Sequence, residues 1–220
     1  MSSNSDNETK EKQYQTVYTA VSHYPNASNN HHHSFKKMQE FIKTYRGKIM
    51  IFIDGSNLFY TAGMMGIEID YLKLVDVLVG EGQLLRVNFY AGVDDEHTGS
   101  INWQTFMKRT GFKMITKQVV SYADGKQKAN CDVEMAVDMI NLSNSFDTAV
   151  VVSGDGDLTY AVNCLINKGK QVEVFGLKAN TNDYLMDAAD RFIDLDSIRH
   201  LIVKNYKDKQ YVNKNVCSYN

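Results

Sequence analysis

The chain is poor in cysteine, and its cysteines are not paired. Cys131, Cys164 and Cys217 lie far apart, and no two of them form a C-x-x-C motif. This spacing excludes a disulfide framework and a zinc knuckle. No stretch approaches the roughly 18 consecutive apolar residues of a membrane helix, so we expect no membrane span. The first residues, MSSNSDNETKEKQ, lack the basic start and apolar stretch of a secretory signal, and we expect a cytoplasmic protein.

The chain also lacks an excess of charge of either sign. Its formal net charge is -2, from 24 Lys and Arg and 26 Asp and Glu. A chain this close to neutrality exerts no long-range attraction on phosphates, so any binding of nucleic acid has to be local. Histidine is scarce in the part that is predicted to fold, where only His97 and His200 occur. This scarcity weighs against zinc and against catalysis by a serine or cysteine nucleophile.

Composition divides the chain into four segments. Residues 1–34 are rich in Asn, Ser and His, and they are predicted to be disordered or loosely ordered. Residues 35–46 have helical spacing and are predicted to form a leading helix. Residues 47–203 are predicted to form one domain, and residues 204–220 a polar C-terminal tail.

From residue 47 onward, apolar strand-like runs alternate with segments of helical spacing. The predicted strands are 49–53, 85–92, 112–120, 148–153 and 171–176. The predicted helices are 57–64, 70–79, 100–110, 132–144, 157–168, 182–189 and 194–204. This alternation predicts an α/β, Rossmann-like fold with a mostly parallel central sheet and helices on both faces.

Aspartates directly follow two of the predicted strands. Asp54 follows IMIFI, Asp155 and Asp157 follow TAVVVS, and Asp132 opens a predicted helix. Each of them alone is explained as a helix cap or turn residue. If they gather at the carboxyl edge of the sheet, however, the carboxylates repel one another unless a cation neutralises them. Oxygen ligands alone suit Mg²⁺ or Mn²⁺.

The glycines of GDGD (154–157) allow other interpretations, and the local sequence weighs against each. Two glycines between a strand and a helix resemble the start of a dinucleotide-binding loop, but the third glycine is missing and the aspartates would repel a pyrophosphate. An EF-hand loop fails because the positions that need glycine and glutamate hold tyrosine and isoleucine.

The helix predicted from Asp132 onward has two distinct faces. Val133, Val137 and Ile140 form an apolar stripe at helical spacing and are predicted to face the core. Glu134 and Asp138 share another face, which is either a solvated acidic surface or a source of groups that support the metal ligands; Asp138 is the candidate for the second role.

Three stretches of the sequence, in this order, resemble the NYN domain of the LabA/DUF88 family, relatives of the PIN-like nucleases. They are IFIDGSNLFY (51–60), KANCDVEMAVDMI (128–140) and VVSGDGDLTYAVN (151–163), and DYLMDAADRFIDL (183–195) looks like the closing segment of that family. The resemblance implies a PIN-like fold and a metal-dependent ribonuclease activity. It places Asp54, Asp132, Asp155 and Asp157 at the metal-binding positions, and Asn57 and Ser153 at polar positions that support the site.

The resulting hypothesis is hydrolysis of single-stranded RNA with one or two Mg²⁺ or Mn²⁺ ions held by the four aspartates. Asn57 would orient a ligand or the scissile phosphate, and Ser153 would anchor the loop that carries Asp155. The basic residues that would guide the RNA backbone are Lys108, Arg109, Lys126 and Lys128. Two alternatives stay open: a non-catalytic RNA- or protein-binding regulator, and a small-nucleotide phosphohydrolase on the same fold. The sequence also allows a homo-oligomer.

Overall fold

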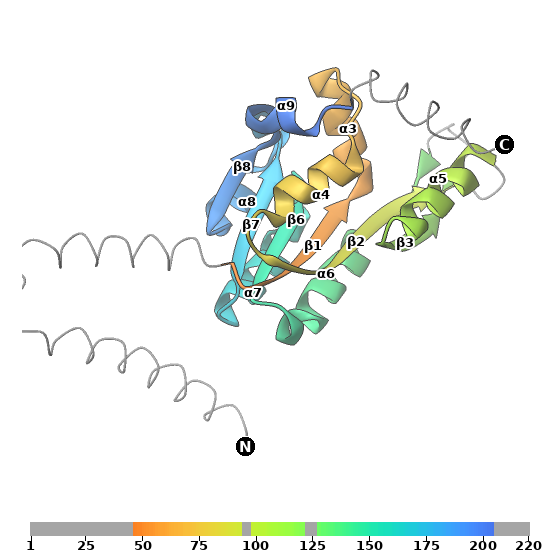
Figure 1. The fold of residues 1–220 in the computed structure, drawn as a ribbon. Helices are drawn as coiled ribbons and strands as arrows, with labels where there is room; N and C mark the ends of the chain where they lie inside the picture. The colour runs from red at the N-terminus through yellow and green to blue at the C-terminus, as the bar shows by residue number, and fades with distance from the viewer. Residues whose placement is uncertain (1–45, 94–97, 122–126, 205–220) are drawn as a thin grey trace, which may run out of the picture. The chain divides into compact units, whose positions relative to one another are not determined.

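The computed structural model describes residues 46–93, 98–121 and 127–204, and its main element is a six-stranded sheet in which all strands run parallel (Figure 1). The strand order is β3-β2-β1-β6-β7-β8. The strands are β1 (Lys48–Asp54), β2 (Gln83–Val93), β3 (Phe112–Gln118), β6 (Thr148–Val152), β7 (Gln171–Gly176) and β8 (Arg191–Asp194). A short antiparallel pair is formed by β4 (Val120–Ser121) and β5 (Gln127–Lys128).

Helices cover both faces of the sheet. One apolar core lies under α3 (Gly55–Met65), α4 (Tyr71–Val79), α5 (Thr98–Arg109) and α9 (Arg199–Ile202). The other lies under α6 (Asp132–Asn141), α7 (Thr159–Asn167) and α8 (Asp183–Ala188). The predicted α/β, Rossmann-like fold is therefore confirmed.

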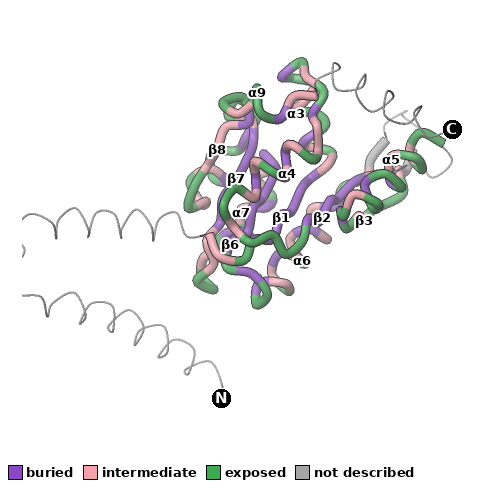
Figure 2. The backbone as a smooth tube through the Cα atoms, in the orientation of Figure 1, coloured by how far each residue is buried: buried purple, intermediate pink, exposed green. Residues whose placement is uncertain are grey.

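Strand β1 lies inside the sheet and is buried on both faces. Ile49, Ile51 and Ile53 belong to one core, while Met50 and Phe52 belong to the other. Burial on both faces explains why the strand is a continuous apolar run, and Figure 2 shows it among the buried parts of the chain. It pairs with β2 on one side and with β6 on the other, so the order of strands reverses at this point. Ligands of open parallel sheets bind at such a point, beyond the carboxyl ends of the strands.

Asx residues begin three of the helices by accepting hydrogen bonds from backbone N–H groups of the first turn. Asp54 begins α3, Asp70 begins α4 and Asn182 begins α8. At the other end of α3, Gly66 adopts a φ of 65°, a left-handed conformation that glycine reaches without steric cost. The helix after β1 therefore starts at an aspartate that the sequence assigns to the functional site.

Three details of the sequence-based prediction are wrong. Strand β8 was not predicted, and the helix expected over 194–204 is instead a 3-10 helix, Leu195–Ile198, followed by the short α9. In α6, Val133 and Val137 were predicted to face the core but are 72% and 49% exposed, whereas Met135 and Met139 are buried against the sheet. The valines and the methionines both have helical spacing, so spacing alone does not decide which pair is buried. The way α6 packs on the sheet buries the methionines.

Several predictions lie outside the described residues. These are the disordered segment 1–34, almost all of the leading helix 35–46, and all of the tail 204–220 except Lys204. Within the described ranges, no helix has both the length and the apolar character that crossing a membrane requires.

Candidate metal centre

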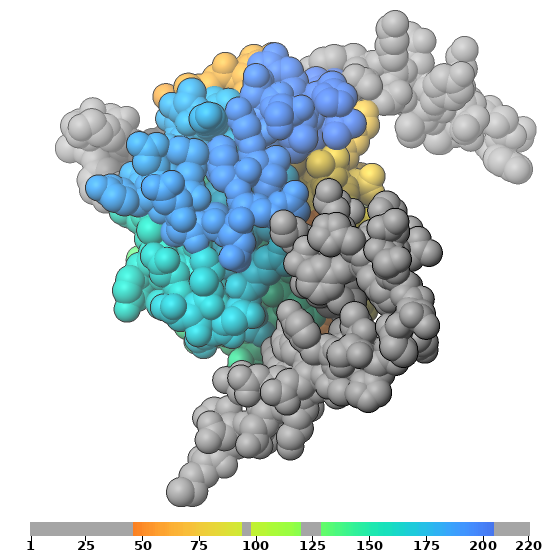
Figure 3. Space-filling model, turned by 90° about the vertical axis from the view of Figure 1, so that its left-hand side faces the viewer, coloured from red at the N-terminus to blue at the C-terminus, as the bar shows by residue number. Residues whose placement is uncertain are grey.

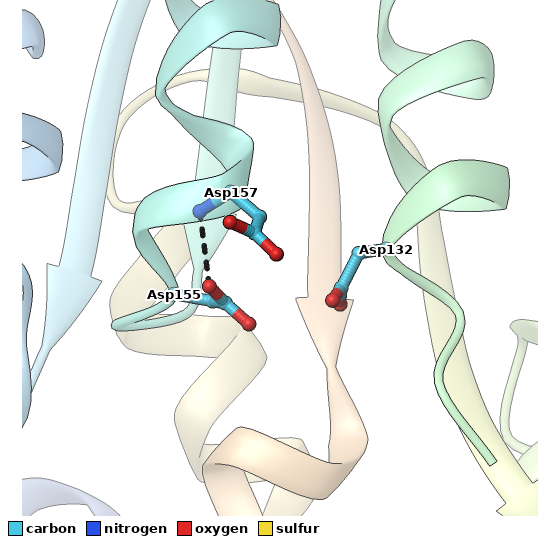
Figure 4. Close-up of side chains that lie close together, drawn as sticks. All are labelled: Asp132, Asp155 and Asp157. Carbon is cyan, nitrogen blue, oxygen red and sulfur yellow. Dashed lines mark hydrogen bonds between the residues drawn. The ribbon is translucent and has the colours of Figure 1, made fainter.

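Three carboxylates from two distant parts of the chain meet at the carboxyl edge of the sheet. Asp132 is the first residue of α6, while Asp155 and Asp157 lie in the turn that follows β6, where the 3-10 helix η2 (Gly156–Leu158) begins. One carboxylate oxygen of each aspartate lies within 4.8 Å of the others. Figure 4 shows the Asp132 side chain facing the other two. The predicted convergence of these three residues is therefore present in the structure.

Asp54 adjoins this group but is held by the protein itself. It is the last residue of β1 and is only 9% exposed. One of its carboxylate oxygens accepts a hydrogen bond from the Asn57 backbone N–H at 3.0 Å, and the other accepts one from the Ser153 hydroxyl at 3.0 Å. Burial raises the pKa of Asp54, and the nearby charge of Asp155 adds to this effect. Asp54 is not among the three residues whose oxygens converge, and its role as a fourth ligand stays a prediction.

Ser153 and Asn57 link the ends of β1 and β6. The Ser153 hydroxyl donates to Asp54 and accepts a hydrogen bond from the Asp155 backbone N–H at 3.1 Å. The Asn57 side-chain oxygen accepts one from the Gly154 backbone N–H at 3.0 Å. These bonds fix the turn after β6 relative to the start of α3. For Asn57, the structure shows a bond to the protein backbone, which positions the loop.

The glycines of this turn are needed for close packing. A Cβ atom on Gly154 would lie 2.7 Å from the backbone oxygen of Asn180, and one on Gly156 would lie 2.7 Å from the side chain of Asn182. The Asn182 backbone N–H also donates to the Gly154 oxygen at 3.0 Å. The segment between β7 and α8 therefore packs directly against the turn that carries the aspartates. A side chain larger than hydrogen at either glycine would push the segment and the turn apart.

Asp132 has the electrostatic environment that a bound cation would relieve. Burial raises its pKa, and the charges of Asp155, Asp54 and Asp157 raise it further. Its Oδ2 atom is shielded from solvent and has no hydrogen-bond partner among the described residues. A buried carboxylate oxygen without a donor is costly. Because the converging donors are all carboxylate oxygens, the group fits a hard divalent cation such as Mg²⁺ or Mn²⁺.

The raised pKa of Asp132 predicts how the stability of the metal-free protein depends on pH. Because the pKa lies above its ordinary value of 3.8, the folded chain binds this proton more tightly than the unfolded chain does. The contribution of Asp132 to the free energy of unfolding therefore falls as the pH rises from 3.8 to the raised value. In EDTA, we expect urea unfolding to show Asp132→Asn gaining stability relative to the wild type across this window. A difference that is the same at every pH would contradict the prediction.

Two residues that the sequence-based prediction missed adjoin α6. The Tyr90 hydroxyl, at the end of β2, donates to Asp138 at 2.9 Å; burial and the charge of Asp138 raise the pKa of Tyr90, so the hydroxyl keeps its proton. Asp138, the predicted supporting residue, therefore holds α6 against the sheet. The Lys117 ammonium, on β3, pairs with Glu134 at 2.7 Å and donates to the Asn130 oxygen at 3.0 Å. It brings a cation to the segment that leads into Asp132.

Two of the four predicted RNA-guiding residues lie away from this edge. Arg109 and Lys108 are exposed at the end of α5, where the chain enters the amino end of β3. This is the opposite edge of the sheet from the carboxylates, and the placement argues against contact with a substrate held there. Lys128 lies in β5, and the structure describes its backbone only; Lys126 lies outside the described residues. Neither position tests the prediction for these lysines.

Comparison with known proteins gives consistent results. The sequence matches the family model described as NYN domain over residues 48–196. It is 29% identical over 173 residues to the "Low amplitude and bright protein LabA" of Synechococcus elongatus, an alignment that covers 75% of this chain and 92% of the relative. Among solved structures, a protein of unknown function from Vibrio parahaemolyticus matches with a TM-score of 0.63 and 25% identity, covering 73% of this chain and 98% of the other.

Proposed function

Because the chain belongs to the NYN domain family, we propose that it hydrolyses phosphodiester bonds of RNA with Mg²⁺ or Mn²⁺ at the carboxyl edge of its sheet. The observation that supports this most directly is the group formed by Asp132, Asp155 and Asp157, with one shielded oxygen of Asp132 left without a hydrogen bond. Such a group is unfavourable as a purely structural feature, because close carboxylates repel one another. It becomes favourable when it binds a cation.

The residues would divide the work as follows. Asp132, Asp155 and Asp157 would hold the ion, and Asp54 of β1 would be the fourth ligand. When bound, the ion would activate water for attack on phosphorus and offset charge in the transition state. The hydrogen bonds of Ser153 and Asn57 link the ends of β1 and β6 and so hold the metal-binding aspartates in position. Lys117, which donates to Asn130, would contact a substrate phosphate, because it lies beside the start of α6.

Removal of the metal should abolish the reaction. We expect the purified protein to cleave labelled single-stranded RNA in Mn²⁺ or Mg²⁺ and to stop when EDTA is added, because each converging ligand is a carboxylate that needs a cation to act on a phosphodiester. Gel analysis of the products measures this directly. In parallel, saturating Mn²⁺ should raise the midpoint of thermal unfolding, since an ion that binds only the folded chain stabilises it by mass action.

Three results would contradict the proposal in different ways. Cleavage that is unchanged in EDTA would exclude the metal-dependent reaction. Tight RNA binding without turnover would favour a non-catalytic regulator. Steady hydrolysis of a mononucleotide, with no cleavage of any RNA, would favour a small-nucleotide phosphohydrolase on the same fold.

A further inference from the structure

Exposed aromatic residues lie on helices that start at the edge of the sheet that carries the carboxylates. Five aromatic residues stand among the exposed large hydrophobic residues of the described chain: Phe59 (79%), Tyr60 (60%), Phe106 (48%), Tyr160 (78%) and Tyr184 (77%). Only Phe106, on α5, follows neither β1, β6 nor β7. The other four lie in the first or second turn of a helix that leads away from the carboxyl end of one of these three neighbouring strands.

Two of these tyrosines flank the turn that carries the metal-binding aspartates. Tyr160 comes three residues after Asp157, at the start of α7. Tyr184 is the second residue of α8, whose N-cap residue, Asn182, hydrogen-bonds to Gly154. Helices α7 and α8 pack against each other, and Figure 3 shows the surface formed by this part of the chain in cyan and blue. Both tyrosines are therefore carried by ordered backbone that adjoins the aspartate-bearing turn.

Charge does not explain how this edge would hold a nucleic acid. The chain has a net charge of -2, the converging side chains are acidic, and α8 adds Asp183 in its first turn. Two exposed cations lie on this side: Lys178, in the segment before α8, and Lys117, near the carboxyl end of β3, which is already paired with Glu134. Phosphates alone would therefore be held weakly here. The exposed ring faces offer the missing contact, because every base has a face that can stack on an aromatic side chain.

We propose that Tyr160 and Tyr184 stack on the bases of single-stranded RNA and present its backbone to the metal centre. This inference rests on the proposed RNA hydrolysis and specifies its substrate class. Paired bases stack on one another inside a duplex and leave no face free, so double-stranded RNA is excluded from this mode of binding. Stacking tolerates any base, so the site selects single strands with little sequence preference.

The test measures binding of a fluorescein-labelled, mixed-sequence RNA 12-mer to the full chain in EDTA, by fluorescence anisotropy. We expect Tyr160→Ala and Tyr184→Ala each to weaken binding about tenfold, and Tyr160→Phe and Tyr184→Phe to bind like the wild type, because phenylalanine keeps the stacking face. Phe106→Ala is the matched control, an exposed aromatic away from this edge, and should change nothing. The dependence of log Kd on log salt should be shallow, with a slope of about 1–2, because few cations contact phosphates.

Each other outcome overturns the inference. It fails if the wild type does not bind single-stranded RNA, if the alanine variants bind as well as the wild type, or if a duplex of equal length binds equally tightly. Altered sedimentation of the alanine variants with unaltered RNA binding would assign the aromatic surface to contact between protein chains. Failure of the proposed hydrolysis looks different: the wild type would bind RNA with the expected variant pattern but release no product in Mn²⁺.

Discussion

Asp155→Asn is expected to lower kcat/KM for RNA cleavage at least about a hundredfold, because the loss of one ligand removes much of the several kcal/mol that a bound ion contributes to the transition state. The substitution is a close isostere. Its side-chain oxygen can still accept the hydrogen bond that the Asp157 backbone N–H donates to Asp155 at 2.9 Å. The second carboxylate oxygen, however, is replaced by an amide nitrogen that carries hydrogens, and the side chain has no charge. The site therefore loses a ligand while the turn keeps its shape.

The same substitution should leave the metal-free protein at least as stable as the wild type. Asp155 lies close to Asp54 and Asp132 and raises the pKa of both through its charge. Removing this charge relieves repulsion in the folded state. Urea unfolding in EDTA should therefore show an unchanged or higher midpoint for Asp155→Asn, whereas the stabilisation of the wild type by Mn²⁺ should be largely lost in the variant.

Asp76→Asn is the matched control for this experiment. Asp76 is an exposed aspartate on α4, and α4 belongs to the layer that covers the opposite face of the sheet from α6 and α7. The control changes the net charge of the chain by the same amount and should leave both kcat/KM and the response to Mn²⁺ as they are. If Asp155→Asn cleaved RNA as fast as the wild type, or if both variants lost activity equally, Asp155 would have no specific role in the reaction.

Glu173→Ala is expected to lower the free energy of unfolding by about 3–5 kcal/mol, the usual cost of breaking a buried ion pair. The Glu173 side chain, on β7, is 2% exposed, and its Oε2 atom lies 2.8 Å from Nη2 of Arg46, whose side chain is 11% exposed. Nη1 of Arg46 also donates to the Val79 oxygen at 2.7 Å, so the guanidinium is held in place. Without Glu173, this buried charge would have no carboxylate to compensate it. Urea unfolding measures the loss.

Arg191→Ala tests the other partner of the same carboxylate. Arg191 lies opposite Glu173 in the pairing of β7 with β8, at 3.4 Å from Oε1, but its side chain is 53% exposed. Because the arginine is exposed to solvent and the contact is long, we expect it to contribute less than about 1 kcal/mol, so this variant should stay close to the wild type. A loss below 1 kcal/mol for Glu173→Ala, or equal losses in the two variants, would contradict the assignment of stability to the buried pair. Cleavage by the folded fraction should be unaffected in both.

The strands that are buried on both faces were predictable because burial on both faces requires a continuous run of apolar residues. Runs such as IMIFI and TAVVVS contain almost only apolar residues, many of them β-branched, and both proved to be central strands. Strand β8, RFID, lies at the edge of the sheet, is short and half-buried, and contains an arginine and an aspartate. Its apolar pattern is too brief to be distinguished from a helix end.

The sequence predicts the site residues that lie at the ends of strands. It does not predict the contacts that depend on the order of the strands in the sheet. Asp54 ends one strand, Asp155 and Asp157 follow another, and a parallel sheet brings such residues to one edge. The contacts of Tyr90 and Lys117 depend on which strands lie beside α6, which the sequence does not state. Arg109 precedes a strand, so the same rule about strand ends assigns it to the amino edge. Applied consistently, the rule would have separated Arg109 from the carboxylates.

The position of β1 between β2 and β6 also has a consequence during synthesis on the ribosome. One side of β1 pairs with β2 soon after both have emerged, but the other side waits for β6, which follows roughly 100 residues later. At the usual rate of about 5–20 residues per second, this wait lasts about 5–20 s. During that time, the nascent chain carries an open edge made of isoleucine, methionine and phenylalanine, the kind of strand that recruits other chains. Residues 49–53 are therefore the segment of this strand that a chaperone of nascent chains would cover until β6 emerges.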